Sequence, residues 1–436
     1  MIADNLSKYA YNLRYNDLSK SVIHEVKRRF IDSIGCAIAS ENSKPVKIAK
    51  KITKPNLPAL KAFLYGTRIR YLDYNDSYIS KDLAHPSDNI GGVLGVAEFE
   101  KSNGRDVILA TALAYEIQCR LCDAASLRIR GWDHVIYGLP ATGLAAGKLM
   151  NLPLKKLTQI TNLTLTTYLS SREVREGTEL SMWKACAFAN VARNSIFAAK
   201  FAKEGMTGPN EVFEGKFGLM NQITGPFKLD IKRFGKRKGH FKILDCWIKK
   251  WPAEIHSQSA IQASLELRKN IKISEISKIN IETHKAGYII IGSGKEKWNP
   301  KTRETADHSL PYIVGAALMN GKIDMNTYSE KKIKDKKLLA LVKKISAKEN
   351  PRLTKLYPRM AANIVRIKLK SGKVLEKRVD YHRGHPKNPM SDREVENKFN
   401  SLTRNFISKK DQKDILKFIW NLEKQKSISQ LLKFLK

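Results

Sequence analysis

The sequence predicts a mainly α fold with a second, α+β domain. Over the first 269 residues, long segments place apolar side chains three and four positions apart, which is the period of an amphipathic helix. Near residue 270 the pattern changes to short runs of isoleucine, and around Val365 apolar and charged side chains alternate as in a strand. The chain of 436 residues also exceeds what one hydrophobic core usually holds, which favours two domains.

The all-α domain is expected to comprise residues 1–269. Its first long helix is predicted by apolar residues at helical spacing, namely Val22, Val26, Phe30, Ile31, Ile34 and Ile38. Further helices are expected over residues 107–117, 141–150, 157–169 and 185–204. The last of these should end at Gly205, because glycine readily takes the left-handed conformation that closes many helices.

The α+β domain is expected to span residues 270–390. Strands are predicted around Ile279, over residues 288–291 and over residues 365–369, where Ser371-Gly372 should turn the chain into a hairpin with residues 374–379.

Residues 391–436 return to a helical period after Ser391, which forms a capping box with Glu394. Because so short a helical segment needs a surface to bury its apolar face, we expect it to pack back on the all-α domain. The α+β domain would then be an insertion.

The charge balance is strongly basic, with 79 Lys and Arg against 42 Asp and Glu and a formal net charge of +37. Nucleic-acid binding is one interpretation of such an excess. The lysines are spread over the whole chain, however, so we interpret them as a solvated surface that attracts anionic substrates. We therefore expect no nucleic-acid partner.

Hydropathy predicts no membrane segment, because no run reaches the roughly 18 apolar residues that a spanning helix needs. The first residues lack the pattern of a signal peptide, and the five cysteines are scattered as in proteins with reduced thiols. These features predict a cytoplasmic protein.

Metal and nucleotide motifs are weak or missing. Cys119 and Cys122 have CxxC spacing, but they fall on a predicted helix and no second pair follows, which argues against a zinc or iron–sulfur site. No P-loop, GxGxxG or GxSxG motif occurs. We expect no metal and no cofactor.

One stretch concentrates groups that can do chemistry. Residues 72–77 bring two carboxylates, an amide and a hydroxyl, and His85 then precedes a predicted helix with Ser87 or Asp88 as its N-cap. Helix N-termini attract anions, so His85 at this place suggests a carboxylate or phosphate pocket. The alternative is an ordinary polar loop with a structural histidine.

Three further helix starts carry a cationic or titratable side chain. His134 precedes the helix near residue 141, Lys184 falls in the first turn of the helix near residue 185, and His308 precedes a helix that Ser309 should cap and Gly321 should end. A lysine opposes the helix dipole at that place, so Lys184 predicts a compensating anion, unless it reaches solvent.

If these helix starts converge, they form a pocket for a ligand with several carboxylates. The chemistry most accessible there without a metal is proton abstraction next to a carboxylate, with a histidine as base or acid.

Several ordered motifs extend over nearly the whole chain. They are Leu72-Asp73-Tyr74-Asn75-Asp76, His85-Pro86-Ser87-Asp88-Asn89, Gly131-Trp132-Asp133-His134-Val135, Ser181-Met182-Trp183-Lys184-Ala185-Cys186, Ala192-Arg193-Asn194, Gly205-Met206-Thr207-Gly208-Pro209 and Arg303-Glu304-Thr305-Ala306-Asp307-His308-Ser309-Leu310-Pro311-Tyr312. With these motifs the sequence resembles the MmgE/PrpD family.

The resemblance implies a lyase without metal or cofactor. Its all-α domain and inserted α+β lid domain would enclose a cleft for a tricarboxylate, and the chain would form a homodimer. The branch that the motifs match best removes water from 2-methylcitrate to give 2-methyl-cis-aconitate in propionate catabolism, within the methylcitrate cycle. Other members decarboxylate cis-aconitate or epimerise related acids, so citrate or cis-aconitate is the alternative substrate.

The resemblance also implies site residues. Catalytic positions are matched by Asp73, His85, His134, Lys184 and Tyr312, and substrate-binding positions by Ser77, Ser87, His256, Gln258 and His308. As a hypothesis, Lys184 holds carboxylates, His85 or His134 moves the proton, Asp73 orients a histidine or the leaving hydroxyl, and Tyr312 helps to protonate that hydroxyl. Ser77 stands where relatives commonly have threonine.

One position departs from the decarboxylase pattern. Gln258 stands where that branch has a histidine, and His256 lies two residues earlier, which favours dehydration over decarboxylation.

Overall fold

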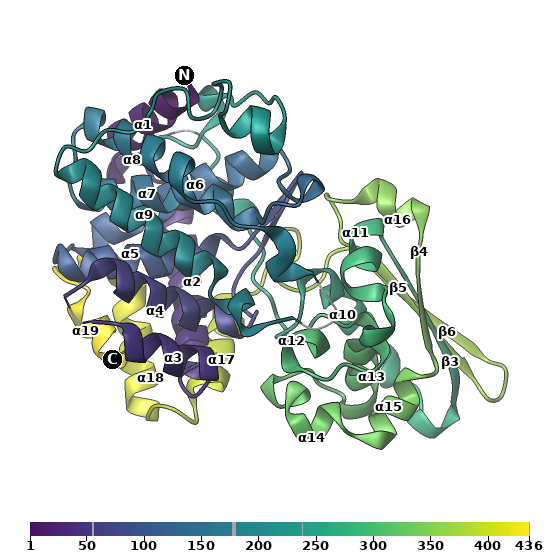
Figure 1. The fold of residues 1–436 in the computed structure, drawn as a ribbon. Coiled ribbons are helices and arrows are strands. Elements are labelled where there is room, and N and C mark those ends of the chain that lie inside the picture. Colours follow the sequence, from purple (N-terminus) through teal and green to yellow (C-terminus); the bar gives the residue numbers. More distant parts are fainter. Residues whose placement is uncertain (55, 177–179, 238, 436) are drawn as a thin grey trace. The chain divides into compact units, whose positions relative to one another are not determined.

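The computed structural model describes residues 1–54, 56–176, 180–237 and 239–435. The chain divides into two compact units (Figure 1). The helical unit comprises residues 1–175, 182–246 and those from 391 onward, and the α+β unit comprises residues 247–390 with the described residues of 176–181. The predicted fold class, mainly α with an α+β part, is confirmed.

The α+β unit begins earlier than the boundary at residue 270 that the sequence predicts. Helix α10 (Gln258–Arg268), which the prediction places in the all-α domain, belongs to the α+β unit. Its residues Ala260, Ala263 and Leu267 are buried in the core of that unit. The helical period identifies the helix but carries no information about its packing partner, so the predicted boundary differs from the observed one.

The helical unit is built from helices that pack around one another, and several of them are buried on almost every side. Along the chain they are α1 (Ile2–Asn12), α2 (Lys20–Ala39), α3 (Lys44–Ile52), α4 (Pro58–Tyr71), α5 (Asn89–Phe99), α6 (Gly104–Ala124), α7 (Gly138–Leu149), α8 (Leu154–Thr167), α9 (Ala187–Lys203), α17 (Asp392–Thr403), α18 (Lys409–Trp420) and α19 (Ser429–Leu432). Two short strands, β1 (Tyr78–Ile79) and β2 (Leu83–Ala84), pair antiparallel between α4 and α5. The helices predicted from the apolar period correspond to α2, α6, α7, α8 and α9.

Local signals at helix ends act as predicted. Gly205 follows α9 with φ of 102°, and its amide donates to the Ala202 carbonyl. At the start of α17 the capping box forms, with the Glu394 amide donating to Ser391 Oγ at 3.3 Å and the Ser391 amide donating to Glu394 Oε2 at 2.9 Å.

Helix α17 packs against α2 although more than 350 residues separate them along the chain. Lys398 Nζ on α17 lies 2.5 Å from Asp32 Oδ1 on α2 and donates to the Tyr74 carbonyl at 2.7 Å. Both charged side chains are buried. The C-terminal helices therefore belong to the helical unit through a buried ion pair as well as through apolar contacts.

Helices α4 and α5 pack unusually closely. This packing brings the polar residues 72–77, which follow α4, near the polar residues 85–89 at the start of α5. A Cβ at Gly91 of α5 would lie 2.5 Å from the Gly66 amide nitrogen and 2.6 Å from Gly66 Cα of α4. Figure 1 shows α4, α5, α7 and α9 as neighbouring helices, and each of the pairs α4/α5, α4/α9, α5/α7 and α7/α9 is in contact.

We expect Gly91→Ala to lower the free energy of unfolding by about 1–3 kcal/mol, because backbone atoms cannot move aside cheaply for the added methyl group. Urea denaturation followed by circular dichroism measures this change. An unchanged denaturation midpoint would contradict the close packing of α4 on α5.

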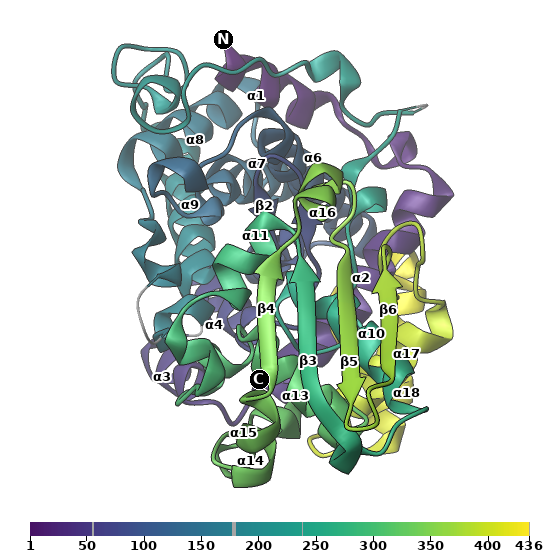
Figure 2. The ribbon, with the colours of Figure 1, turned by 90° about the vertical axis from the view of Figure 1, so that its right-hand side faces the viewer.

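The α+β unit is built on one four-stranded sheet in the order β4-β3-β5-β6, seen face-on in Figure 2. Its strands are β3 (Ile276–Thr283), β4 (Ile345–Glu349), β5 (Asn363–Leu369) and β6 (Val374–Val379). Strand β3 pairs parallel with β4 and antiparallel with β5, with Ile279 opposite Ile345 and Ile367 respectively. Strands β5 and β6 form the predicted hairpin, whose turn includes Gly372 at φ of 88°.

The helices of this unit are α10, already described, and α11 (Lys285–Gly287), α12 (Arg303–Ala306), α13 (Leu310–Asn320), α14 (Glu330–Ile333), α15 (Lys336–Val342) and α16 (Pro351–Leu356). The strand predicted over residues 288–291 is wrong, because Tyr288–Gly292 forms a helical turn that continues α11. A short run of isoleucines does not distinguish a strand from a buried helical turn.

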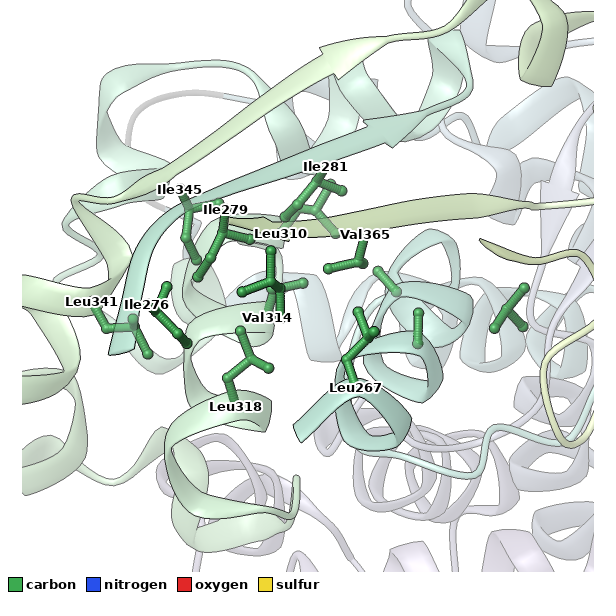
Figure 3. Close-up of a cluster of buried hydrophobic side chains, with 14 of the residues drawn as sticks. Leu267, Ile276, Ile279, Ile281, Leu310, Val314, Leu318, Leu341, Ile345 and Val365 are labelled. Carbon is green, nitrogen blue, oxygen red and sulfur yellow. The ribbon is translucent and has the colours of Figure 1, made fainter. Parts of the chain in front are cut away.

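The core of the α+β unit lies between the sheet and helices α10 and α13. Figure 3 shows Leu310, Val314 and Leu318 of α13 pointing towards the isoleucines of β3. Ser309 caps α13 by accepting from the Tyr312 amide at 3.1 Å, and Gly321 ends it at φ of 67°, as predicted. The alternation of apolar residues along β3 and β5 therefore places these side chains on the face of the sheet that packs against the helices.

None of the helices in the described part of the chain combines the length and the apolar character that crossing a bilayer requires.

Candidate functional site

Four helix ends of the helical unit meet at one place. They are the C-terminal end of α4 and the N-terminal ends of α5, α7 and α9, which carry Asp73, His85, His134 and Lys184 in the adjoining turns. Lys184 Nζ lies 3.4 Å from Asp73 Oδ2, and the ring centroids of His85 and His134 lie 5.7 Å apart. All four side chains are buried. The structure thus gathers the four catalytic candidates that belong to this unit.

Asp73 connects two cations. It follows α4 with φ of 49°, a left-handed conformation that aspartate tolerates better than most residues. Its Oδ1 accepts from Arg70 on the last turn of α4, and its Oδ2 faces Lys184. Of the two interpretations of Lys184, the structure therefore shows the compensating anion, supplied by the protein itself.

His85 is oriented through its Nδ1. That nitrogen lies 2.7 Å from the Asp76 carbonyl oxygen and 3.0 Å from Ser77 Oγ. A carbonyl oxygen can only accept, so Nδ1 carries a hydrogen and donates it. Ser77 is thereby placed beside His85, where it can hold the ring or contact a ligand.

His134 is oriented by its neighbour in the chain. Its Nδ1 lies 2.8 Å from Asp133 Oδ1, and Asp133 Oδ2 lies 3.2 Å from an Arg175 guanidinium nitrogen. Burial opposes ionisation of Asp133, but Arg175 and His134 outweigh it and hold the pKa of that carboxyl well below its usual range. Burial lowers the pKa of His134, although Asp133 opposes this shift.

The start of α5 is held by residues of the 72–77 stretch. Asp88 occupies the predicted N-cap position of α5, but its side chain makes no capping hydrogen bond. Instead the Ser87 amide donates to Asp76 Oδ1 at 2.9 Å, and Asn75 Nδ2 donates to Ser87 Oγ and Asp88 Oδ1 at 2.8 and 2.7 Å. The predicted substrate contact of Ser87 stays a prediction.

Asp88 is a further carboxylate beside Arg70. It is buried, and burial raises its pKa to about 7 against the opposing charge of Arg70, whose Nε lies 3.7 Å away. Arg70 therefore lies close to both Asp73 and Asp88. Because Asp88 gains a proton as the pH falls, the negative charge next to Arg70 depends on pH.

Two candidates in the α+β unit have structural roles there. The Tyr312 hydroxyl donates to the Thr327 carbonyl at 2.8 Å inside an apolar cluster, so the predicted help in protonating a leaving hydroxyl has no support in this unit. The Gln258 carboxamide donates to the carbonyls of Trp251 and Ala253 and accepts from the Trp251 amide. Its polar atoms shape the loop before α10, because a buried amide must find partners close by.

The two histidines predicted for substrate binding are also buried or nearly so. His308 Nδ1 lies 2.6 Å from Asp307 Oδ1, and Arg303 lies 3.6 Å from Asp307 Oδ2, which repeats the Arg–Asp–His order seen at His134. His256 packs against His284 with ring centroids 4.9 Å apart. Their roles in substrate binding stay predictions.

The CxxC pair is buried on α6. Cys119 Sγ lies 3.9 Å from Cys246 Sγ, and burial raises the pKa of both Cys119 and Cys122 thiols well above the usual value. A zinc ligand must be a thiolate, so this environment disfavours the metal interpretation.

Three residues of the site escaped prediction as functional residues. Arg70 precedes Asp73 by three positions on the helical period, a spacing that could have indicated the pair. Asp133 lies within a motif but received no role. Arg175 reaches Asp133 across 42 positions, and no local signal points to it.

Two family models together match most of the chain. The model described as MmgE/PrpD N-terminal domain matches residues 4–232, and the model described as MmgE/PrpD C-terminal domain matches residues 251–424. The second match runs past residue 390, so it includes α17 and α18, which fold into the helical unit.

Curated relatives resemble the chain over most of its length. A 2-methylcitrate dehydratase of Escherichia coli is 28% identical over 350 residues, which are 75% of this chain and 71% of the relative. A 2-methylcitrate dehydratase of Salmonella typhimurium is 26% identical over 86% of this chain and 84% of its own. An alkylcitrate dehydratase of a fungal species is 25% identical over 94% of this chain and 88% of its own.

Proposed function

The chain belongs to the MmgE/PrpD family, and from this premise we propose that it is a hydro-lyase that dehydrates 2-methylcitrate to 2-methyl-cis-aconitate. The names of its relatives support the reaction, and the charged cluster of the helical unit supports the chemistry.

The reaction needs a base, an acid and a stabilising positive charge. A base takes the proton from the carbon that bears the methyl group and a carboxylate, the carbon–carbon double bond forms, and the neighbouring carbon–oxygen bond breaks. The hydroxide leaves as water once an acid supplies a proton. Because charge builds up on the carboxylate next to the reacting carbon, a fixed cation there lowers the barrier.

The observation that carries the proposal is the meeting of His85, His134, Lys184 and Asp73 at four helix ends. The two histidines supply imidazoles, which can take a proton as a base and return it as an acid. Lys184 supplies the cation, and Arg70 shares the Asp73 carboxylate with it. Buried charges are screened less than exposed ones, which strengthens their action on an anionic substrate.

We also propose that the reaction needs no metal or other cofactor, and that the protein works as a cytoplasmic homodimer. The metal-free part follows from the chemistry above, in which side chains supply the base, the acid and the cation.

We expect purified protein to convert 2-methylcitrate in the presence of EDTA, with rising ultraviolet absorbance from the conjugated alkene as the measurement. Citrate and cis-aconitate are offered in parallel. Loss of activity on chelation, restored by a divalent cation, would contradict the metal-free mechanism. Release of carbon dioxide from cis-aconitate without turnover of 2-methylcitrate would assign the chain to the decarboxylating alternative.

Related alkylated citrates form the second candidate substrate class, because the fungal relative is named an alkylcitrate dehydratase. Comparing turnover of citrate, 2-methylcitrate and a citrate with a longer alkyl chain tests this class directly.

A further inference from the structure

We propose that Asp133 and Arg175 are positioning residues that hold His134 in the tautomer with a bare Nε2, which makes His134 the base of the dehydration. The inference rests on the proposed function for the reaction, and it assigns the base to the histidine whose Nδ1 faces a carboxylate, whereas Nδ1 of His85 faces a backbone carbonyl.

Backbone pairing places the three residues. The Asp133 amide donates to the Ser170 carbonyl at 2.9 Å, and the Arg172 amide donates to the Gly131 carbonyl at 3.0 Å. This short antiparallel contact aligns the loop before α7 with the segment that leads to Arg175. The Arg175 guanidinium can then reach Asp133 while one of its nitrogens donates to the Lys184 carbonyl at 3.4 Å.

The Asp133 carboxylate determines which ring nitrogen of His134 carries hydrogen. An ionised carboxylate has no hydrogen to donate, and Arg175 keeps Asp133 ionised, so the 2.8 Å contact requires a hydrogen on His134 Nδ1. In the neutral ring Nε2 is then a bare lone pair. Nε2 is buried, and none of the described residues hydrogen-bonds to it.

Charge favours the same assignment. The groups that act on His134 are Asp133, Arg175 and Asp82, with the His85 ring nearby. Burial lowers the pKa of His134 from 6.5, so the ring is neutral at pH 7 and able to accept a proton. Once it has accepted one, the adjacent Asp133 carboxylate stabilises the imidazolium, as the aspartate does in a Ser-His-Asp triad.

The first test reads the tautomer without any substrate. Protein labelled with ¹⁵N-histidine is examined by long-range ¹H–¹⁵N correlation, and the His134 signals are assigned by their loss in His134→Gln. We expect Nδ1 to be protonated and Nε2 to be bare. A His134 ring with its hydrogen on Nε2, or with both nitrogens protonated at pH 7, would overturn the inference.

The second test uses Asp133→Asn. Arg175 would hold the new carbonyl oxygen, so the amide group faces Nδ1 and forces the hydrogen onto Nε2. We expect kcat to fall by up to about 10⁴-fold, the loss that follows when the aspartate of a Ser-His-Asp triad becomes asparagine and the histidine takes the wrong tautomer, with a much smaller change in KM. The ¹⁵N spectrum should show the switched tautomer in the same variant. A variant that keeps the kcat of the unaltered protein would refute the positioning role.

The matched control is Asp245→Asn, which removes the carboxylate of an exposed Asp–His pair in the same unit, with 2.8 Å between Asp245 Oδ1 and His240 Nε2. We expect it to leave kcat unchanged.

Arg175→Gln adds a pH readout. Because the cation lowers the pKa of His134, its removal should move the acid limb of kcat/KM to higher pH. An unmoved limb counts against the assignment.

Failure of the proposed function looks different from failure of the inference. If 2-methylcitrate is not converted but the tautomer and its switch are found, the substrate proposal fails and the positioning roles of Asp133 and Arg175 stand. If turnover is normal and the tautomer is the opposite one, only the assignment of His134 as base fails.

Discussion

Lys184→Met should lower kcat/KM for 2-methylcitrate by about 10²–10³-fold, the loss that follows removal of one fixed group that stabilises charge in a transition state. Methionine keeps most of the length of the side chain but removes the cation that faces Asp73. The substrate carboxylates lose an attractive partner in the ground state, and the developing negative charge loses one in the transition state. Both KM and kcat should therefore deteriorate, as steady-state rates over a range of substrate concentrations will show.

The control for this variant is Lys61→Met. Lys61 Nζ lies 3.5 Å from Glu98 Oε1 in the same unit, so the control removes a similar ion pair away from the site. We expect nearly unaltered kinetics for it. Full turnover by Lys184→Met, with the protein folded by circular dichroism, would remove Lys184 from the catalytic set and weaken the proposed function with it.

Lys398→Met should lower the free energy of unfolding of the helical unit by about 3–5 kcal/mol, because it leaves a buried carboxylate without its cation. The side chains of Lys398 and Asp32 are 4% and 0% exposed, so water cannot take over the role of the lost partner. The pair also joins α17 to α2, so the variant should loosen the C-terminal helices first. Urea denaturation followed by tryptophan fluorescence measures the effect.

The pH dependence of Lys398→Met follows from Asp32. Burial raises the pKa of Asp32 against the opposing effect of Lys398, so without the lysine that pKa rises further. A carboxyl whose pKa is higher in the folded than in the unfolded state binds its proton more tightly when folded. Its contribution to stability therefore grows as the pH falls through the folded-state pKa, and the deficit of the variant should shrink as the pH is lowered.

Two further variants separate the ion pair from other effects. Lys203→Met breaks a more exposed pair with Glu100 and should change stability by only about 0–1 kcal/mol. The double variant Asp32→Asn/Lys398→Met removes both charges and should be more stable than Lys398→Met alone. A double variant no better than the single one would show that the loss comes from packing and not from an uncompensated charge.

Sequence alone recovers the parts of the fold that local physics decides. The apolar period predicts helices such as α2 and α9, and the alternation around Val365 predicts β5 with its hairpin. Gly205, Ser309 and Ser391 mark helix ends because each acts on amides or carbonyls within a few residues of itself. Residues 288–291 form a helical turn and not the predicted strand, because a short run of apolar residues suits both structures.

The sequence likewise predicts some features of the site and misses others. The sequence shows that His85, His134 and Lys184 each stand at a helix start, and the motifs around them place the chain in its family. It does not show that Lys184 faces Asp73 across 111 positions, or that Arg175 lies against Asp133. Equally, the sequence does not show that the side chains of Gln258 and Tyr312 donate hydrogen bonds to backbone carbonyls.

The sequence by itself determined several of the helices, the hairpin of β5 and β6, the helix ends at Gly205, Ser309 and Ser391, and the residue types that the chemistry needs. The tertiary structure alone decided which charges meet, which ring nitrogen of His134 holds a hydrogen, and which unit takes α10. The physical reason is the distance along the chain over which each interaction acts. Backbone periodicity and capping act over a few residues, whereas an ion pair or a shared core depends on how distant segments pack, and that depends on the whole chain.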